Sequence, residues 1–136
     1  MADFDNNQVI DEFRASEGRV GGMFEGVPML LVTHTGRKSG RRLTTPLVYT
    51  RDGDDLVVAA SKAGADTHPA WYLNMAADPN VHIELGGEAY DCVARVLADG
   101  EERDRRYRAH ADQQPQFNEY EAQTSRVIPI VVLSRA

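Results

Sequence analysis

The sequence predicts a small β-barrel with peripheral helices, a mainly β chain of the α+β class. Short apolar and β-branched segments are separated by turn signals such as Asp52-Gly53 and Gly86-Gly87, which is typical of strands joined by hairpins. The early strands lie too close together in the sequence for the helical crossovers that parallel strands need. Helical patterns occur in the middle of the chain and before its last strand, so we expect those helices at the periphery of the barrel.

Six strands are expected, recognised by apolar runs or by alternation of apolar and polar residues. In chain order they cover residues 28–35, 44–51, 56–61, 81–85, 90–96 and 127–133. The second strand is expected to be the hairpin partner of the first. Pro129 lies in the last strand and predicts an edge position or a bulge, because proline has no N–H to give to a sheet.

A short N-terminal helix is expected at about residues 6–15, where Val9, Ile10 and Phe13 follow asparagines at helical spacing. Its apolar stripe could pack on the barrel, on a partner or lightly on a membrane. Three apolar side chains are few for a membrane anchor, which favours packing on protein.

Three further helices are expected between the strands. The first begins near Pro69 and ends at Asp78-Pro79, because proline fits a first helical turn and disfavours continuation of a helix before it. Asp99 and Glu102 have the spacing of a capping box, which predicts a charged helix to about residue 111. A short helical segment follows at about 117–120.

Length, charge and the content of cysteine and histidine limit the classes of protein to which this chain can belong. A chain of 136 residues is expected to form one domain over residues 1–136, and no apolar run approaches the roughly 20 residues that span a bilayer. The acidic N-terminus is unlike a basic signal peptide, so a cytoplasmic location is expected. A net charge of −6 argues against general nucleic-acid binding. One cysteine, Cys92, and four scattered histidines give no local metal motif.

Positive charge is concentrated at one place in this acidic chain. Residues 26–51 hold five of the 15 Lys and Arg side chains and none of the 21 Asp and Glu side chains, so the remaining residues carry a net charge of −11. Within this window, Gly36 and Gly40 flank Arg37 and Lys38. Glycines allow main-chain N–H groups to turn toward a bound oxyanion while basic side chains close over it. This stretch therefore predicts a site for one small anion.

No hydrolytic constellation accompanies the anion site. Ser61 lacks a GxSxG context, Cys92 lies in an alternating strand, and the basic turn is not a Walker loop because no GK[ST] is present. The remaining features form a binding surface for a ligand with a phosphate at one end and a flat ring at the other. They include the small polar residues Ser39, Thr44, Thr45 and Ser61, and an aromatic helix that carries Trp71 and Asn74. Trp71 could equally be a core aromatic residue, and Asn74 an amide on the helix surface.

An ordered set of motifs extends over nearly the whole chain: GRKSG, TTPL, Ser61-Lys62, HPAWYLNMAADPNV and FNEYEAQTSRVIPIVVL. In this order they resemble the deazaflavin-dependent nitroreductase family of actinobacteria. The resemblance implies a split β-barrel like that of FMN-binding oxidases. It also implies reduced coenzyme F-420, an 8-hydroxy-5-deazaflavin, as hydride donor.

The same resemblance implies roles for particular residues. Arg37, Lys38 and Ser39 would hold the phosphate and acidic tail of the coenzyme, and Leu43, Thr44, Thr45, Pro46, Leu47 and Val48 would line its path. Ala60, Ser61, Lys62 and Ala63 would lie against the deazaflavin, and Ala70, Trp71, Tyr72, Leu73 and Asn74 would complete the pocket. Ser61 and Tyr120 would orient the substrate or relay a proton.

Three positions depart from the pattern of the family. Leu43 stands where an arginine is common, so that Arg41 or Arg42 would have to supply the charge. The loop after Lys62 reads AGAD where paired glycines are common. Phe117 stands where some relatives have tyrosine.

The expected function is reduction of a quinone, an enone or a nitroaromatic compound by hydride transfer from the coenzyme. Two alternatives stay open: a split barrel that holds FMN or haem instead, and a non-catalytic carrier of the deazaflavin. The expected protein is a monomer or homodimer, with weak membrane contact through the N-terminal helix as an option.

Overall fold

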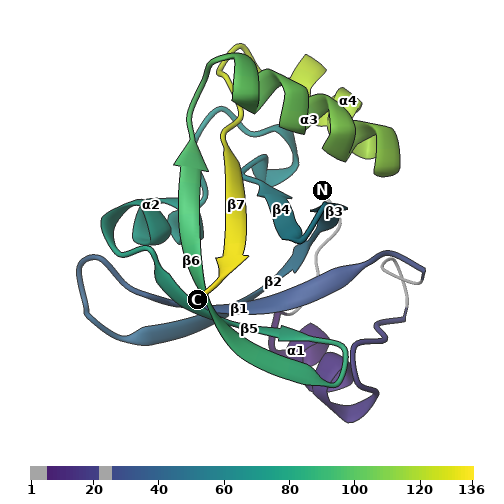
Figure 1. The fold of residues 1–136 in the computed structure, drawn as a ribbon, viewed down its shortest axis with the longest axis vertical. Coiled ribbons are helices and arrows are strands. Elements are labelled where there is room, and N and C mark those ends of the chain that lie inside the picture. Colours follow the sequence, from purple (N-terminus) through teal and green to yellow (C-terminus); the bar gives the residue numbers. More distant parts are fainter. Residues whose placement is uncertain (1–5, 22–25) are drawn as a thin grey trace.

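The computed structural model describes residues 6–21 and 26–136 (Figure 1). In this part of the chain, strands form one sheet in the order β2-β1-β5-β6-β7-β4-β3, and every neighbouring pair is antiparallel. The strands are β1 (Met29–Thr35), β2 (Arg42–Val48), β3 (Thr50–Asp52), β4 (Asp55–Ala59), β5 (Asn80–Leu85), β6 (Glu88–Leu97) and β7 (Ile130–Arg135). The prediction of a mainly β fold with hairpin-linked strands is confirmed.

The sheet curls into a half-barrel because its two outermost strands are consecutive in the chain. The predicted single strand at 44–51 is wrong, since the chain changes direction at Tyr49. The part before it pairs with β1 as β2, and the part after it pairs with β4 as β3. With one residue between them, β2 and β3 can occupy opposite edges of the sheet only if the sheet bends until these edges approach each other.

Strand β7 lies inside the sheet, between β6 and β4, and not at an edge. The interpretation of Pro129 as the mark of an edge or a bulge is therefore wrong. Pro129 comes just before the first strand residue, and its carbonyl accepts a hydrogen bond from the N–H of Ala60 at 2.9 Å. The missing proline N–H thus costs the sheet no ladder hydrogen bond.

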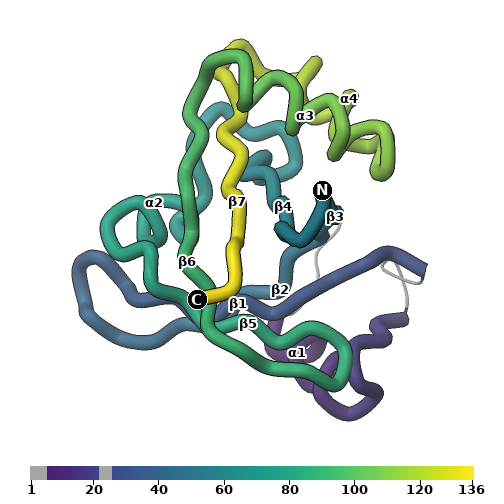
Figure 2. Tube along the Cα trace, in the orientation of Figure 1, coloured from purple at the N-terminus to yellow at the C-terminus, as the bar shows by residue number. Residues whose placement is uncertain are grey.

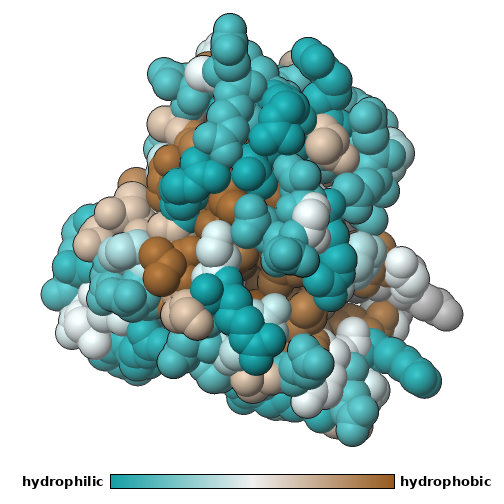
Figure 3. Space-filling view, in the orientation of Figure 1, coloured by the Kyte–Doolittle hydropathy of each residue, from teal (hydrophilic) through white to brown (hydrophobic). Residues whose placement is uncertain are grey.

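The helices lie at the periphery of the barrel, as predicted (Figures 1 and 2). They are α1 (Asn6–Ala15), α2 (Ala70–Ala77), α3 (Glu101–Gln113) and α4 (Gln116–Ala122), together with a 3-10 turn at Lys62–Gly64. Helices α3 and α4 lie together at one end of the half-barrel, α1 lies at the other end, and α2 lies at its side. Polar residues cover much of α3 and α4 in Figure 3, whereas hydrophobic residues show mainly in the middle of that view, over the sheet.

Helix α1 packs on the protein through its predicted apolar stripe. Val9, Ile10 and Phe13 are buried in one cluster with Met29 and Leu31 of β1, and Phe13 is 1% exposed. The alternate residues of β1 point the other way, into the barrel core. None of the described helices is long and apolar enough to cross a membrane.

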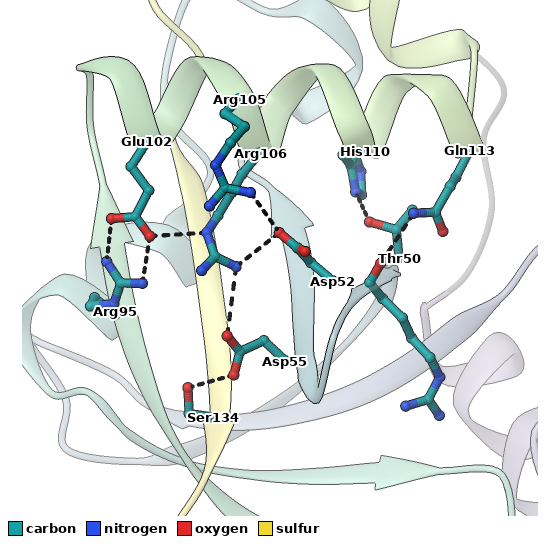
Figure 4. Close-up of polar contacts among 11 residues, drawn as sticks. Thr50, Asp52, Asp55, Arg95, Glu102, Arg105, Arg106, His110, Gln113 and Ser134 are labelled. Atoms are coloured by element: carbon teal, nitrogen blue, oxygen red, sulfur yellow. Dashed lines mark hydrogen bonds and ion pairs between the residues drawn. The ribbon is translucent and has the colours of Figure 1, made fainter.

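The capping box predicted for α3 is wrong. Gly100 is the N-cap residue and no side chain caps the helix. Glu102 instead accepts hydrogen bonds from the guanidinium of Arg95 at 2.9 and 2.7 Å and from Nε of Arg106 at 3.0 Å (Figure 4). The hydrogen bonds from Arg95 are the main cause of a Glu102 pKa lowered to about 2, and the bond from Arg106 adds to them. Arg106 also reaches Asp52 at 3.2 Å, which ties α3 to the β3–β4 hairpin.

His110 anchors the same helix from the inside. Its Nδ1 lies 2.6 Å from Oγ1 of Thr50, and its ring meets the edge of Phe117 at 4.3 Å between centroids (Figure 4 shows the Thr50 contact). The side chain is fully buried, and Nε2 has no hydrogen-bond partner among the described residues. Burial lowers the pKa of His110 to about 4. The folded protein therefore holds this histidine in its neutral form.

Candidate functional site

The basic turn between β1 and β2 presents three cations without acidic partners. Arg37, Lys38 and Arg41 are exposed, and none of them forms an ion pair with another described residue. Arg42 differs, because its Nη1 donates to Oγ1 of Thr35 at 2.8 Å. Three unneutralised cations on one turn suit an anionic group of a ligand.

Fewer main-chain N–H groups of this turn are available to bind an anion than the sequence predicted. The N–H of Gly36 donates to the carbonyl of Arg41 and that of Gly40 donates to the carbonyl of Gly36, both at 2.8 Å. The N–H of Arg41 donates to Oγ of Ser39 at 3.2 Å, and that of Arg37 is also occupied. The N–H groups of Gly36, Arg37, Gly40 and Arg41 are therefore already bonded within the protein, which leaves those of Lys38 and Ser39 for an anion. This turn can hold an anion chiefly through its side chains.

Helix α2 lies beside the basic turn (Figures 1 and 2) and is joined to it by Asn74. Oδ1 of Asn74 accepts the N–H of Arg37 at 3.0 Å, and its Nδ2 lies 3.1 Å from Nδ1 of His34. Asn74 is 6% exposed, so the alternative of a surface amide is wrong. Trp71 is 9% exposed and packs in the barrel core, which agrees with the alternative that it is a core aromatic residue.

The predicted lining from Leu43 to Val48 is divided by the alternation of β2. Thr45 shares the barrel side of the sheet with His34, because their side chains are 2.9 Å apart, whereas Val48 packs toward α1. The side chains of this range therefore cannot all face one ligand. Because β2 is an outer strand of the sheet, its unpaired backbone groups are also open to a ligand.

The loop predicted to lie against the deazaflavin has an unusual backbone. Lys62 and Ala63 have φ of 48° and 54°, and Gly64 has φ of 86°, so three successive residues are left-handed. A Cβ on Gly64 would lie 2.6 Å from Oε1 of Gln123, which shows how closely the segment after α4 packs on the loop. Non-glycine residues keep such conformations only where their surroundings impose them. Ser61, just before this turn, is 7% exposed.

Arg126 contacts both ends of this loop, a role that the sequence analysis did not predict. Its Nη2 donates to the carbonyls of Ala60 at 3.0 Å and Ser61 at 2.9 Å, and its Nε donates to the carbonyl of Ala65 at 2.8 Å. Its Nη1 lies 3.1 Å from Nδ1 of His68. One guanidinium thus holds both ends of the loop. In the sequence, Arg126 is a lone base before the last strand, with no local signal of these contacts across the fold.

Tyr120 lies against the same loop. Its carbonyl oxygen is 3.2 Å from the position of a Cβ on Gly64, and its ring meets Phe117 edge-on at 5.2 Å. The ring of Tyr72 on α2 lies 4.9 Å from that of His68, which Arg126 holds. The contacts therefore run without a break from the basic turn through α2 and the loop to α4. We call this series of contacts, from the basic turn at 36–41 through α2 and the loop at 60–65 to Tyr120, the strip. The main groups of predicted site residues lie along it.

The strip contains no activated protein nucleophile. Cys92 is buried on β6, and burial raises its pKa to about 11, so it is a thiol at neutral pH. Among the described residues, no three His, Cys, Asp or Glu side chains are placed to hold a metal ion together. The exposed cations at one end of the strip suit the binding of an anionic ligand.

The sequence model of the F420H(2)-dependent quinone reductase family matches residues 6–135. The chain belongs to this family. An F420H(2)-dependent quinone reductase of Mycobacterium tuberculosis is 36% identical to it over 129 residues, which are 90% of this chain and 85% of that protein. The predicted family, the oxidoreductase class and the use of coenzyme F-420 are therefore confirmed.

One solved structure agrees with this assignment to the F420H(2)-dependent quinone reductases, and two others share the fold. An F420-H2 dependent reductase is 35% identical, with a TM-score of 0.71 over 79% of this chain and 94% of that one. A protein described as a domain-swapped dimer is 32% identical, with a TM-score of 0.73 over 94% and 96% of the two chains. A pyridoxamine 5'-phosphate oxidase-like protein from Listeria innocua, only 8% identical, has a TM-score of 0.57 and shares the fold alone. The split barrel is thus confirmed.

Proposed function

We propose that this family member transfers a hydride from reduced coenzyme F-420 to a quinone. Enones and nitroaromatic compounds are further acceptors on chemical grounds, because they too are electron-poor. The observation that carries the proposal is the unbroken strip that leads from three unpaired cations, through Asn74 on α2, to the Arg126-braced loop and Tyr120. A coenzyme with an anionic tail and a flat ring fits such a strip.

The protein contributes binding and orientation. When bound, the coenzyme supplies the hydride, which with one proton converts the quinone to a hydroquinone. Arg37, Lys38 and Arg41 bind the acidic tail, and Arg41 replaces the charge missing at Leu43, since Arg42 is held by Thr35. The braced loop at 60–64 forms a rigid surface for the ring, which favours productive alignment. Ser39, and those predicted residues of β2 and α2 whose side chains face the turn, such as Thr45 and Asn74, border the path between them.

Ser61 and Tyr120 are the proposed polar groups on the acceptor side. The Ser61 side chain has no hydrogen-bond partner among the described residues, so its hydroxyl is free to bind an acceptor oxygen or pass it a proton. Tyr120 is half-buried and forms an aromatic wall beside the loop. The absence of a nucleophile elsewhere on the strip suits hydride transfer, which needs none.

Replacing Lys38 by alanine should weaken coenzyme binding about ten- to a hundredfold, because a charge-assisted contact contributes roughly 1.5 to 3 kcal/mol. The loss should shrink as salt rises, since salt screens exposed charges. Fluorescence titration of the coenzyme measures both effects. Arg108→Ala, which removes an exposed cation on α3, is the matched control. Equal affinity of Lys38→Ala and the wild type at low salt would remove Lys38 from the site.

Replacing Tyr120 by alanine should leave coenzyme affinity within about threefold while lowering catalytic efficiency about ten- to a hundredfold. The factors should differ between bulky and small acceptors, because each uses the aromatic wall differently. Steady-state kinetics on several quinones measures this, and Tyr120→Phe separates the hydroxyl from the ring. A stable Tyr120→Ala protein with normal turnover on every acceptor would disprove the role. Weakened coenzyme binding would instead place Tyr120 on the coenzyme side.

Two other functions are distinguished by the same assays. A split barrel that holds FMN or haem would bind that cofactor at submicromolar concentration and ignore the deazaflavin. A carrier would bind reduced F-420 tightly, but it would not oxidise the coenzyme whichever acceptor is added. We therefore propose a panel of quinones, enones and nitroaromatic compounds as the test of function, with turnover of at least the quinones as the expected result.

Assembly and location stay predictions from the sequence. The chain is a monomer or a homodimer, and light scattering decides between them. Cell fractionation tests the cytoplasmic location. Weak membrane contact through α1 would have to use its exposed polar face, because Val9, Ile10 and Phe13 are covered by the protein. Failure to sediment with anionic vesicles would exclude that contact.

A further inference from the structure

In a chain of hydrogen bonds beneath the basic turn, the chemistry of the groups fixes which atom donates and which accepts at every step. The N–H of Arg37 can donate but never accept, so the atom of Asn74 that faces it at 3.0 Å must be the amide oxygen. The NH2 group of Asn74 then faces Nδ1 of His34 at 3.1 Å. Because that NH2 group can only donate, Nδ1 of His34 must be the acceptor.

The direction continues through the ring to β2. A neutral imidazole that accepts at Nδ1 carries its proton on Nε2, and Nε2 of His34 lies 2.9 Å from Oγ1 of Thr45. His34 is 2% exposed, and burial, aided by the positive charge of Arg42, lowers its pKa. The ring is therefore neutral at neutral pH. Thr45 accepts from it, so the hydroxyl proton of Thr45 must point elsewhere.

The remaining hydroxyl proton of Thr45 has no acceptor among the side chains of the described residues. Thr45 is half-buried on an outer strand, a few residues from the three unpaired cations of the turn. Its proton is thus held, without a local partner, beside the proposed coenzyme path.

We propose that His34 is a positioning residue that fixes the Asn74 amide under the basic turn and makes Thr45 a hydrogen-bond donor to an acceptor atom of the coenzyme. This inference rests on the proposed function for its ligand, but the direction of the chain is a property of the protein alone. His34 acts through Asn74 and Thr45 and does not touch the coenzyme. The site therefore selects for a hydrogen-bond acceptor beside Thr45.

The direction is tested without coenzyme, by nitrogen NMR of the histidine rings in the full-length protein. The expected result is a neutral His34 protonated on Nε2 at neutral pH. In the Asn74→Ala variant, the Nδ1 signal should move because its hydrogen bond is lost. A proton on Nδ1, or a charged ring at neutral pH, would overturn the proposal. This readout does not depend on the identity of the ligand.

The consequence for the ligand is tested by titrating F-420 into Thr45→Val and Thr45→Ser. Loss of one neutral hydrogen bond should weaken binding about three- to tenfold in Thr45→Val, while Thr45→Ser should stay within about twofold of the wild type. Thr33→Val is the matched control, because Thr33 bonds Thr44 on the other face of the sheet. Equal binding by the wild type and Thr45→Val would overturn the donor role.

Variants of His34 complete the test. His34→Leu should weaken coenzyme binding at least as much as Thr45→Val, and His34→Gln should restore part of it, because glutamine can both accept and donate. Unchanged affinity in a folded His34→Leu protein would overturn the positioning role. If the wild type itself binds no F-420, the proposed function and the ligand of Thr45 both fail, while the NMR result still decides the direction of the chain.

Discussion

Replacing Arg126 by methionine is expected to lower coenzyme affinity about a hundredfold and the free energy of unfolding by about 3 kcal/mol. Methionine is close to arginine in length but has no donors, so the carbonyls of Ala60, Ser61 and Ala65 would all lose the guanidinium. An unsatisfied buried acceptor costs roughly 1 to 3 kcal/mol, and the partial exposure of Arg126 keeps the total toward the low end. The left-handed residues Lys62 and Ala63 would then relax.

Fluorescence titration and thermal unfolding measure these two effects. Arg126→Lys keeps the charge but can no longer reach both ends of the loop. Its coenzyme affinity and its free energy of unfolding should therefore lie between those of the wild type and of Arg126→Met. Arg108→Met makes the same replacement at an exposed position on α3 and should match the wild type. A methionine variant with wild-type affinity and stability would show that the loop keeps its shape without Arg126.

The second large effect is on stability at acid pH. The pKa of His110 is about 4 in the folded protein against an ordinary value of 6.5, so the unfolded chain binds the proton more tightly. Stability from this residue is therefore complete above pH 6.5 and is lost as pH falls toward 4. This difference in pKa corresponds to about 3 kcal/mol of unfolding free energy.

Urea unfolding of the wild type and of His110→Gln across this pH window tests the assignment. The glutamine variant should be less stable at neutral pH but should lose much less stability on acidification. His82→Gln, which replaces a half-buried histidine on β5 that pairs with Asp91, shows how much of the pH dependence comes from a histidine other than His110. Parallel curves for the wild type and His110→Gln would mean that other groups cause the acid sensitivity.

Periodicity and turn residues predicted most of the fold, because these signals are local. The stripe of α1 and the hairpin turn at Gly86 were found in this way. The break at Tyr49 was not predicted, since an apolar run looks the same whether a strand continues or changes partner. The interior position of β7 also depends on which strands pair, and Pro129 gave a misleading local signal.

The candidate site was predicted as a set of motifs but not as a geometry. The cations of the basic turn and the aromatic helix were recognised because residue type and family resemblance both marked them. His34 and Arg126 were missed, since each acts through partners 11 to 66 residues away in the chain. Asn74 was placed at the site by residue type and by resemblance, but its role as a bridge between the turn and His34 follows from the fold.

The most direct test of the proposed function is an anaerobic single turnover with purified protein, reduced F-420 and a soluble quinone. The account predicts that one hydroquinone forms for each coenzyme oxidised, at a rate that depends on the protein and falls in Tyr120→Ala. Tight binding of reduced F-420 with no hydroquinone formed from any quinone would contradict it.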